Sequence, residues 1–468
     1  MHISGIVSGL DTDTLIEQLM AIERRPLVLM QERKTTLEKQ RDAWRDVNTR
    51  LNNLRDRMAE LSRLSLFERR AVTSSKAEVA TATANRNAVE AVYRISVQQL
   101  AAAHRVAGKR FETVDGKAAP KEPLGLSGEA RLRVGQNGDW ITVAVDAADT
   151  LESIAAKINE AAGGAVIARV LDGRLILEAK ETGAANTLEF EVPGGSDPSA
   201  VNIWQELGVV DDAGEILNEL QAAQDAVFTV EGLTITRSSN TVDDLIEGVT
   251  LQLKGVGETT LEIRRDVDAV VDAVRRFVEQ YNSTMSFIQD RMGENGVLKG
   301  DTLLMRIQMQ LRADVMAPVA ATGLKYNQLA AVGISVDKSG TMSLDEARLR
   351  EALGESPEEV ARLFTASKED GDPFDGVAIR LEQRFQQWLA AGDGLLAARQ
   401  KLFGDRIKAI EDSMDRFEQR MEIREANLRR QFLALEEALA SLQTQSNWLA
   451  NQLVQLSAMA SAIAARNR

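Results

Sequence analysis

Few side chains in this sequence belong to the types that catalysis or metal binding requires. There is no cysteine, so a disulfide, a thiol nucleophile and a thiolate metal ligand are all impossible. The two histidines, His2 and His104, are too few for a multi-histidine metal site. A Ser-His-Asp arrangement would need one of them, and His104 lies in an alanine-rich stretch between predicted strands. We therefore predict a protein that is not an enzyme and has no cofactor.

One stretch has the spacing of a calcium-binding loop. Ser335, Asp337, Ser339, Gly340 and Glu346 occupy the positions at which an EF-hand places its first ligands, its glycine and its final glutamate. A true EF-hand loop begins with a carboxylate and follows a helix, whereas this one begins with serine and follows a predicted strand. A hairpin turn followed by a helix cap explains the pattern, and we predict no metal site.

The whole chain has a net charge of −14, and its acidic residues are concentrated in the middle. Between Phe111 and Asp268 there are about 29 acidic and 12 basic side chains. Such a region repels phosphate backbones, so nucleic acid is not an expected partner. An enzyme or adhesin acting on carbohydrate would need opposed carboxylates in a pocket of this region, and no spacing favours that alternative.

Length and composition favour a protein of several domains with aliphatic cores. The chain has 468 residues, of which 44% are hydrophobic but only 4% aromatic. No apolar run is long enough to span a bilayer, so we expect no membrane insertion. The first residues lack the pattern of a Sec signal peptide, which predicts either a soluble protein or export by another route.

Two helices are predicted near the beginning of the chain, separated at Pro26. Thr14 and Glu17 fit a capping box, which would place Leu15, Leu19 and Ile22 on one face of the first helix. The second helix has apolar residues every seven positions, which is typical of a coiled coil. These residues are Met30, Leu37, Trp44, Leu51 and Met58, with Val47, Leu54 and Leu61 at the positions three later.

The end of the chain has a matching pattern, which predicts one helix from residue 395 to residue 456. The apolar residues at strict sevens are Ile407, Met414, Met421, Leu428, Leu435, Leu442, Leu449 and Leu456. A second row of apolar residues accompanies the first, and its spacing changes along the helix. Ile410 and Phe417 lie three residues after members of the first row, whereas Phe432, Leu439 and Leu453 lie four residues after them. This shift predicts a change of packing partner between residues 421 and 432.

The two patterns predict that the ends of the chain pair with each other. In an antiparallel arrangement, residues 30–61 lie beside 403–421, and the first helix lies beside 432–456. The alternative is that each end forms a separate coiled coil with other copies. The small basic clusters at Arg24-Arg25 and Arg429-Arg430 fit a solvated helix face.

Between the ends, the apolar period changes from helical to two, which predicts β-strands. Residues 91–98, 132–134, 140–145, 174–178 and 227–230 alternate in this way, with turn signals at 137–138, 172–173 and 231–232. A hairpin followed by a capped short helix is predicted with its helix at 149–154 and again at 240–246, which indicates either a weak internal repeat or a shared local solution without duplication. Helices are predicted at 266–292, 302–316 and 345–353, the last after a hairpin at 334–344.

The sequence resembles the bacterial flagellar filament cap family, hook-associated protein 2 or FliD, over nearly its whole length. The resemblance rests on segments that occur in the same order as in the family. These are residues 5–20 (GIVSGLDTDTLIEQLM), 23–27 (ERRPL), 93–101 (YRISVQQLA), 149–159 (DTLESIAAKIN), 239–253 (SNTVDDLIEGVTLQL), 277–282 (FVEQYN), 333–337 (GISVD), 431–436 (QFLALE) and 446–449 (SNWL).

This resemblance implies an α+β multidomain fold in which the long terminal helices pair as a leg and stalk around inserted β-rich head domains. The leg would comprise residues 1–29 paired with 430–468, and the stalk helix 30–75 would pair with a helical region at 266–429 that includes a small hairpin. The first head domain would comprise 76–110 and 225–265, and 111–224 would form the second, outermost one. The seam residues would be those named above, from Leu15 and Leu19 through Met30 to Leu428.

The resemblance also implies a function and partners. Family members form a ring, often a pentamer, at the distal tip of the filament, where they promote flagellin folding and polymerisation and prevent subunit loss. The implied partners are other copies, flagellin, the hook-associated junction protein and a cytoplasmic export chaperone. By position, the chaperone would bind the segment that contains Phe432, Leu435, Leu439, Leu442, Leu449, Leu453 and Leu456. Secretion would use the flagellar type III system, and the exposed head could contribute to cell adhesion. The alternative is another flagellar axial protein or a tail-fibre-like structural protein.

Overall fold

The computed structural model describes residues 11–113, 115–192, 202–319, 324–392 and 394–466, with side chains up to residue 460. The chain divides into two compact units. The helical unit comprises Met1–Leu64 and Val271–Arg468, and the β-rich unit is Ser65–Val270. The β-rich unit is thus inserted between two parts of the helical one, and the predicted α+β class is confirmed.

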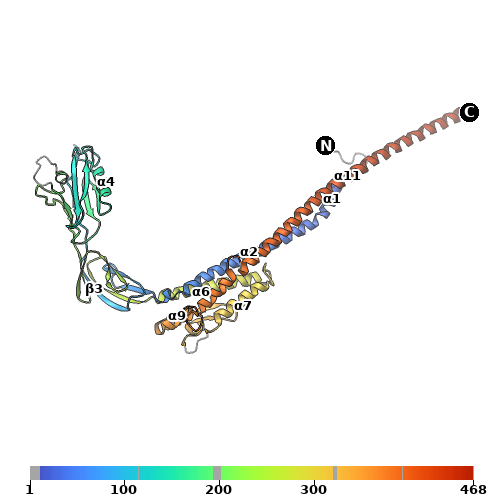
Figure 1. Cartoon of the computed structure of the whole chain (residues 1–468). Helices are drawn as coiled ribbons and strands as arrows, with labels where there is room; N and C mark the ends of the chain where they lie inside the picture. The colour runs from blue at the N-terminus through green and yellow to red at the C-terminus, as the bar shows by residue number, and fades with distance from the viewer. Residues whose placement is uncertain (1–10, 114, 193–201, 320–323, 393, 467–468) are drawn as a thin grey trace. The chain divides into compact units, whose positions relative to one another are not determined.

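The helical unit contains the two ends of the chain, which run side by side in Figure 1. Helix α11 is a single long helix, as the sevens predict, and α2 is the second longest helix of the described chain. The elements of this unit are α1 (Thr12–Glu23), α2 (Arg25–Leu61), α6 (Val267–Met292), α7 (Thr302–Met316), η1 (Leu329–Val332), β16 (Ile334–Val336), β17 (Met342–Leu344), α8 (Glu346–Glu355), α9 (Pro357–Thr365), α10 (Val377–Leu389) and α11 (Leu395–Arg466).

The break between α1 and α2 lies where Pro26 predicts it. Proline lacks a backbone N–H and is tolerated in the first turn of a helix, and Pro26 occupies that turn of α2. The predicted capping box is wrong, because Asp11 and not Thr14 caps α1. The Asp11 carboxylate accepts hydrogen bonds from the backbone N of Thr14 at 3.0 Å and from its hydroxyl at 2.6 Å.

The carboxyl half of α2 is buried in the core of the helical unit. Trp44, Val47, Leu51, Leu54 and Met58 are all fully buried. The indole N of Trp44 donates to Asp301 Oδ2 at 3.1 Å, and Arg399 donates to the same oxygen at 2.5 Å. The other oxygen of Asp301 caps α7 by accepting from the backbone N of Leu303 and of Leu304. One carboxylate therefore joins α2, α7 and α11.

The β-rich unit contains two sheets packed around one core and a second core farther along the chain. The first core, which includes Ile95, Phe228 and Leu261, has residues from a five-stranded and a three-stranded antiparallel sheet. Their strand orders are β1-β15-β3-β11-β12 and β13-β14-β2. The strands are β1 (Arg70–Ser74), β2 (Ala80–Ala84), β3 (Ala91–Gln99), β11 (Ala226–Val230), β12 (Leu233–Arg237), β13 (Thr241–Ile246), β14 (Val249–Leu253) and β15 (Gly257–Arg265).

The second core lies between residues 105 and 221 and combines sheets with helix α4 (Leu151–Ala161), which packs against β7 and β6. Thr150 and Ser153 form a reciprocal capping box at the start of α4. Two sheets contribute, β10-β4-β8-β7 and β6-β5-β9. The strands are β4 (Arg105–Ala107), β5 (Gly128–Val134), β6 (Ile141–Val145), β7 (Val166–Leu171), β8 (Arg174–Ala179), β9 (Leu188–Phe190) and β10 (Glu219–Gln221), and a short helix α5 (Ile203–Glu206) completes this part.

Several predicted boundaries differ from the structure. The stalk helix does not reach residue 75, because α2 ends at Leu61 and is followed by α3 (Leu64–Phe67) and strand β1. The first head domain does not extend to residue 110, because β4 pairs with β8 of the second core. Within residues 240–246, Thr241–Ile246 form strand β13 paired with β14, so the predicted repeat of a capped helix is wrong.

Candidate functional site: the paired terminal helices

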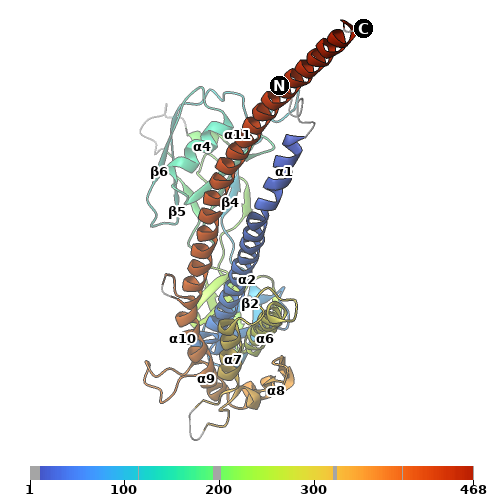
Figure 2. The same cartoon turned by 90° about the vertical axis from the view of Figure 1, so that its right-hand side faces the viewer.

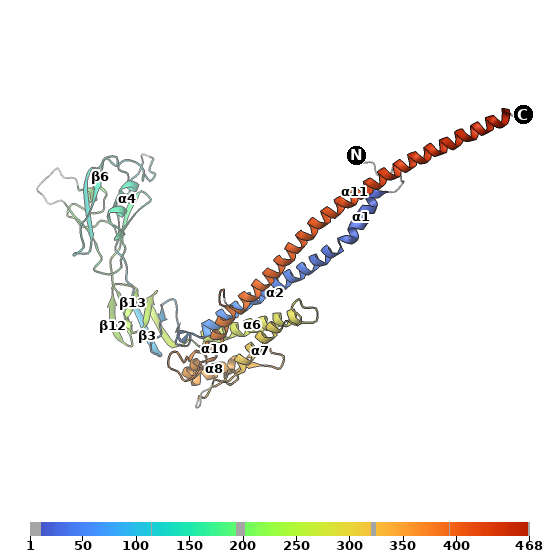
Figure 3. The ribbon, with the colours of Figure 1, turned by 45° about the vertical axis from the view of Figure 1, so that its right-hand side comes forward.

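Ion pairs along α1, α2 and α11 show that the two ends of the chain run antiparallel. Lys34 of α2 contacts Glu411 of α11 with a separation of 2.7 Å. Farther toward the amino terminus, Arg24 contacts Glu425 at 3.2 Å, Glu23 contacts Arg424 at 3.2 Å, and Asp13 contacts Arg429 at 3.3 Å. As the residue numbers in α2 and α1 decrease, those of their partners in α11 increase, which is the antiparallel order. Figures 1 and 3 show α1 beside α11.

These exposed ion pairs define the register of the two helices, but they contribute little to the stability of the helix pair. The side chains of Arg24 and Arg429 keep 52% of their surface exposed, so each pair contributes only about 0.2–1 kcal/mol. The basic clusters predicted as a solvated face are therefore solvated, and they also link the two helices. Glu23 pairs with Arg424, and Arg24 pairs with Glu425. A shifted register of the two helices would instead bring like charges together.

Apolar contact between α1 and α11 comes from a small cluster. Ile16 and Met20 are each 3% exposed and pack with Leu428, and half-buried Met421 and Phe432 lie against them. Ile16 and Met20 are four residues apart and so share one face of α1. Neither residue was in the predicted seam, although their spacing is the signal that could have identified them.

The face of α1 predicted from the sequence is the exposed one. Leu15 is 37% exposed, Leu19 42% and Ile22 58%, so these residues do not pair with α11 within this chain. The register is also different, because α1 lies beside residues 421–432 of α11 and not beside 432–456. Whether Leu15 and Leu19 contact another copy stays a prediction.

Along α2, the predicted seam separates into two parts. Met30 and Leu37 are half-buried in the part of α2 that follows α11, near the Lys34 to Glu411 ion pair. Trp44 already lies opposite the start of α11, since the Arg399 guanidinium carbon is 5.5 Å from its ring. Leu51 and Met58 therefore lie beyond the start of α11, and α2 also contacts α10. The expectation that 30–61 pairs entirely with 403–421 is wrong for its second half.

The apolar residues at every seventh position of α11 are buried in its first part and exposed in its last part. Ile407 and Leu428 are buried, and Met414 and Met421 are half-buried. Beyond Leu428 the same row continues with residues that are about half exposed or more. These are Leu435 at 48%, Leu442 at 60%, Leu449 at 55% and Leu456 at 60%.

The second row of this face also continues outward. Phe432 and Leu439 are half-buried, and Leu453 is 66% exposed. We call the face formed by Leu435, Leu439, Leu442, Leu449, Leu453 and Leu456 the distal seam. It continues the surface that packs on α1, and in Figures 2 and 3 the ribbon of α11 extends past the described start of α1. Exposed apolar surface is often found where proteins bind one another, and the assignment of this face to a partner stays a prediction.

The residues with possible chemistry do not converge in the described part of the chain. The ring of His104 is buried, with Nδ1 accepting from the backbone N of Leu188 at 2.7 Å and Nε2 at 3.1 Å from Glu219. Asp337 accepts from the Ser339 hydroxyl and the Thr341 amide in the turn between β16 and β17, so the calcium-like spacing forms a hairpin. No group of three potential metal ligands was found among the described residues.

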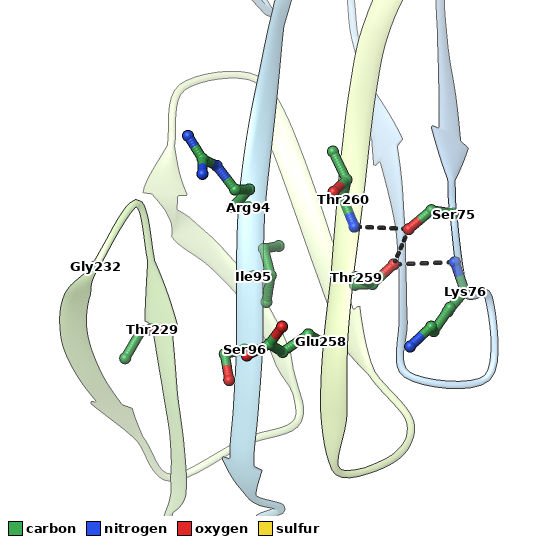
Figure 4. Close-up of a pocket in the computed structure, with 10 residues that line it drawn as sticks. All are labelled: Ser75, Lys76, Arg94, Ile95, Ser96, Thr229, Gly232, Glu258, Thr259 and Thr260. Carbon is green, nitrogen blue, oxygen red and sulfur yellow. Dashed lines mark hydrogen bonds between the residues drawn. The ribbon is translucent and has the colours of Figure 1, made fainter.

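A depression on the five-stranded sheet has polar walls but lacks a pair of opposed carboxylates (Figure 4). Its volume is about 470 Å³, and Glu258 is the acidic residue among those that line it. The hydroxyl of Thr259 accepts from the backbone N of Lys76 at 3.0 Å, and Ser75 accepts from that of Thr260 at 2.9 Å. These bonds join the end of β1 to β15, so the polar residues have a structural use. Glycosidase-type chemistry is not favoured here.

No described helix is both long enough and apolar enough to cross a membrane. The exposed leucines of α11 alternate with polar side chains such as Gln443, Gln445 and Asn451. The distal seam lies along one side of this helix, and Trp448 and Val454 are exposed on other sides of it.

Comparison with known proteins identifies relatives that match both ends of the chain. Residues 8–104 match the model of the flagellar hook-associated protein 2 N-terminus, and residues 223–444 match that of its C-terminus. The A-type flagellar hook-associated protein 2 of Pseudomonas aeruginosa is 28% identical, over 97% of each chain. The flagellar hook-associated protein 2 of Escherichia coli K12 is also 28% identical, over 96% of this chain and 97% of its own.

A solved structure extends this similarity to the fold. The D1-D2-D3 domains of the E. coli flagellar cap protein FliD superpose with a TM-score of 0.57 and 28% identity, covering 77% of this chain and 99% of that one. The matched segments and this structure include both the helical and the β-rich units described above. The chain belongs to the flagellar hook-associated protein 2 family.

Proposed function

We propose that this chain is a structural protein that caps the tip of a bacterial flagellar filament. The observation that carries this proposal is the match of both ends of the chain to the family, combined with the distal seam on the C-terminal helix. It would act by binding and releasing other protein subunits, without covalent catalysis. The relatives named above are hook-associated or cap proteins, which favours the cap over other axial or fibre-like proteins.

The distal seam is suited to bind other subunits because its burial would be strongly favourable. Burying one leucine contributes roughly 1.5–3 kcal/mol before the cost of ordering is subtracted. Burial of the six residues of the distal seam would therefore stabilise a complex by several times the free energy that one leucine contributes. We propose that α1 and the part of α11 from residue 421 onward act as the leg, that α2 and the helical region form the stalk, and that the β-rich unit is the head.

The partners follow from this proposal. We infer an oligomeric ring, with a pentamer as the specific expectation, that contacts flagellin and the hook-associated junction protein. Before assembly, an export chaperone would cover the segment from Phe432 to Leu456, since an exposed leucine stripe would otherwise promote association. Export would use the flagellar type III system.

A deletion strain tests the function directly. Cells that lack this chain should secrete flagellin monomer and build no filament, and the wild-type gene should restore filaments. A strain with normal filaments would instead support the alternative of another structural component.

Two variants then test the distal seam in the same strain. Leu442→Glu with Leu449→Glu should export poorly or fail to restore filaments, because charge on both leucines prevents burial of the stripe. Ile423→Glu is the matched control, since Ile423 is 62% exposed on the same helix but lies off the seam. If the double variant and the control variant restored filaments equally well, the seam would no longer be part of the proposal.

A further inference from the structure

A groove between α2 and α6 holds two arginines without acidic partners. The groove has a volume of about 480 Å³ and includes Arg50 and Asn53 from α2 and Gln280, Phe287 and Arg291 from α6. It lies within the helical unit, and none of these residues belongs to the seam between α2 and α11. Neither arginine has a carboxylate within 4.0 Å among the described residues.

Both guanidinium groups stack on one aromatic ring. The central guanidinium carbon of Arg50 is 4.3 Å from the centre of the Phe287 ring, and that of Arg291 is 4.7 Å from it. Arg50 donates one hydrogen bond, to the Ser283 hydroxyl at 2.8 Å. The Nε of Arg291 is buried and has no hydrogen-bond partner in the structure. Two cations are therefore held close together with much of their hydrogen-bonding capacity unused.

The chemistry of the groove fits a single carboxylate. Arginine pairs with carboxylates through two parallel N–H bonds, and two fixed guanidiniums can share one anion between them. The amide groups of Asn53 and Gln280 add neutral donors. Asp46 also lines the groove, and its charge would repel a multiply charged anion such as phosphate more than one carboxylate.

We propose that the groove receives an acidic side chain from a second copy of this chain. This inference rests on the proposed function, since a cap built of identical copies needs contacts between them. With 70 acidic and 56 basic residues, copies of the chain repel one another, and a cationic groove offsets that repulsion locally. The contact would set the register between copies as well as add affinity.

The helical unit also carries exposed acidic side chains that could enter the groove, although basic residues are interspersed among them. Asp412, Glu418 and Glu422 are exposed on α11, and no basic group lies within 4.0 Å of them among the described residues. The groove and these three acidic residues lie on different parts of the helical unit, so their contact would be head-to-tail. Head-to-tail contacts between identical copies close into rings when the rotation permits.

Charge reversal tests the groove against a matched position. Arg50→Glu should raise the dissociation constant of the oligomer at least tenfold, as measured by native mass spectrometry across a concentration series. Arg45→Glu makes the same change on the same helix outside the groove and should assemble like the wild type. Arg291→Gln should weaken assembly as well, and urea unfolding verifies that each variant is folded.

Photo-crosslinking identifies the occupant. A benzoylphenylalanine placed at residue 53 should crosslink to a second copy, within a peptide that contains residues 412–422. Crosslinks that map only to flagellin, or oligomers of Arg50→Glu that match the wild type, would overturn the inference. The proposed function would survive either result, because it depends on the filaments of the deletion strain.

Discussion

At the residue scale, Asp301 is a side chain that joins three helices of the helical unit. Its side chain is 7% exposed, and it caps α7 while accepting bonds from Trp44 and Arg399. Hydrogen bonds to charged groups contribute about 1.5–3 kcal/mol each, and losing an N-cap costs about 1 kcal/mol. These contributions are not additive, because the same carboxylate makes them.

Asp301→Ala should lower the free energy of unfolding of the helical unit by about 3 kcal/mol, because Arg399 and Trp44 lose their acceptor. Urea unfolding followed by Trp fluorescence measures this change. Asp345→Ala is the control, since Asp345 is an exposed cap that accepts one backbone bond at 3.1 Å, and it should cost about 1 kcal/mol. Equal losses in the two variants would contradict the assigned importance of Asp301.

Asp149 gives the β-rich unit a defined response to acid. Burial favours the neutral carboxyl, but hydrogen bonds from the Asp146 amide, Lys157 and Ser153 outweigh burial and hold the pKa of Asp149 below its usual value. A carboxylate with a lowered native pKa stabilises the fold above its unfolded pKa of about 3.9, and this contribution is lost as pH falls through the native pKa.

Asp149→Asn should therefore be less stable than the wild type by about 2 kcal/mol at pH 7, and the difference should shrink as the pH falls below about 4. Urea midpoints measured between pH 2.5 and pH 7 test this expectation. A difference that stays constant over this range would show that the charge of Asp149 does not stabilise the unit.

At the element scale, the pairing of α1 with α11 depends on one face of a short helix. Isolated helices of this length are marginal in water, so α1 depends on burial of Ile16 and Met20 for its order. Leu15 and Leu19 lie outside this contact.

Met20→Ala should detach α1, because removing a buried methionine side chain costs about 2–5 kcal/mol. Amides of α1 should exchange with solvent at least roughly tenfold faster in hydrogen-exchange mass spectrometry. Leu19→Ala, one residue away and exposed, should leave exchange nearly unchanged. If the Leu19 variant had the larger effect, the assignment of the buried face would be incorrect.

Local patterns predicted the elements better than their partners. Alternation predicted β3 and β8, and the Asp172-Gly173 turn between β7 and β8 has the positive φ angles that its residues favour. Residues 240–246 have the local signals of a capped helix, but pairing with β14 makes them a strand. Helices α9 and α10 were not predicted, although α9 is strongly amphipathic, because with 9 and 13 residues neither is long enough to show two full heptads.

The predicted site was correct in its helices and wrong in part of its register. The helix predicted over residues 395–456 begins at Leu395 as expected, and it continues to Arg466. The heptad pattern could not indicate that α11 begins opposite Trp44, because that depends on where α10 and the preceding turn fit against α2. The buried face of α1 was equally ambiguous, since apolar residues occupy both of its sides.

At the scale of the whole molecule, α11 has a partner along one part and an exposed seam along another. In the isolated chain, amides of residues 435–456 should exchange faster than those of residues 403–428, because α2 and α1 cover only the latter segment among the described residues. Assembly should slow exchange in residues 435–456. Strong protection of that segment in the isolated chain would contradict its assignment as an interaction surface.

The central claim is that the beginning and the end of one chain pair antiparallel, in the register of the Lys34 to Glu411 ion pair. Because the chain has no cysteine, Lys34→Cys with Glu411→Cys creates a unique pair for a short bismaleimide crosslinker. The account predicts rapid crosslinking within one molecule at high dilution, and little for Lys34→Cys with Ile423→Cys, which lies three turns farther along α11. Crosslinking of the second pair in place of the first, or only between molecules, would contradict it.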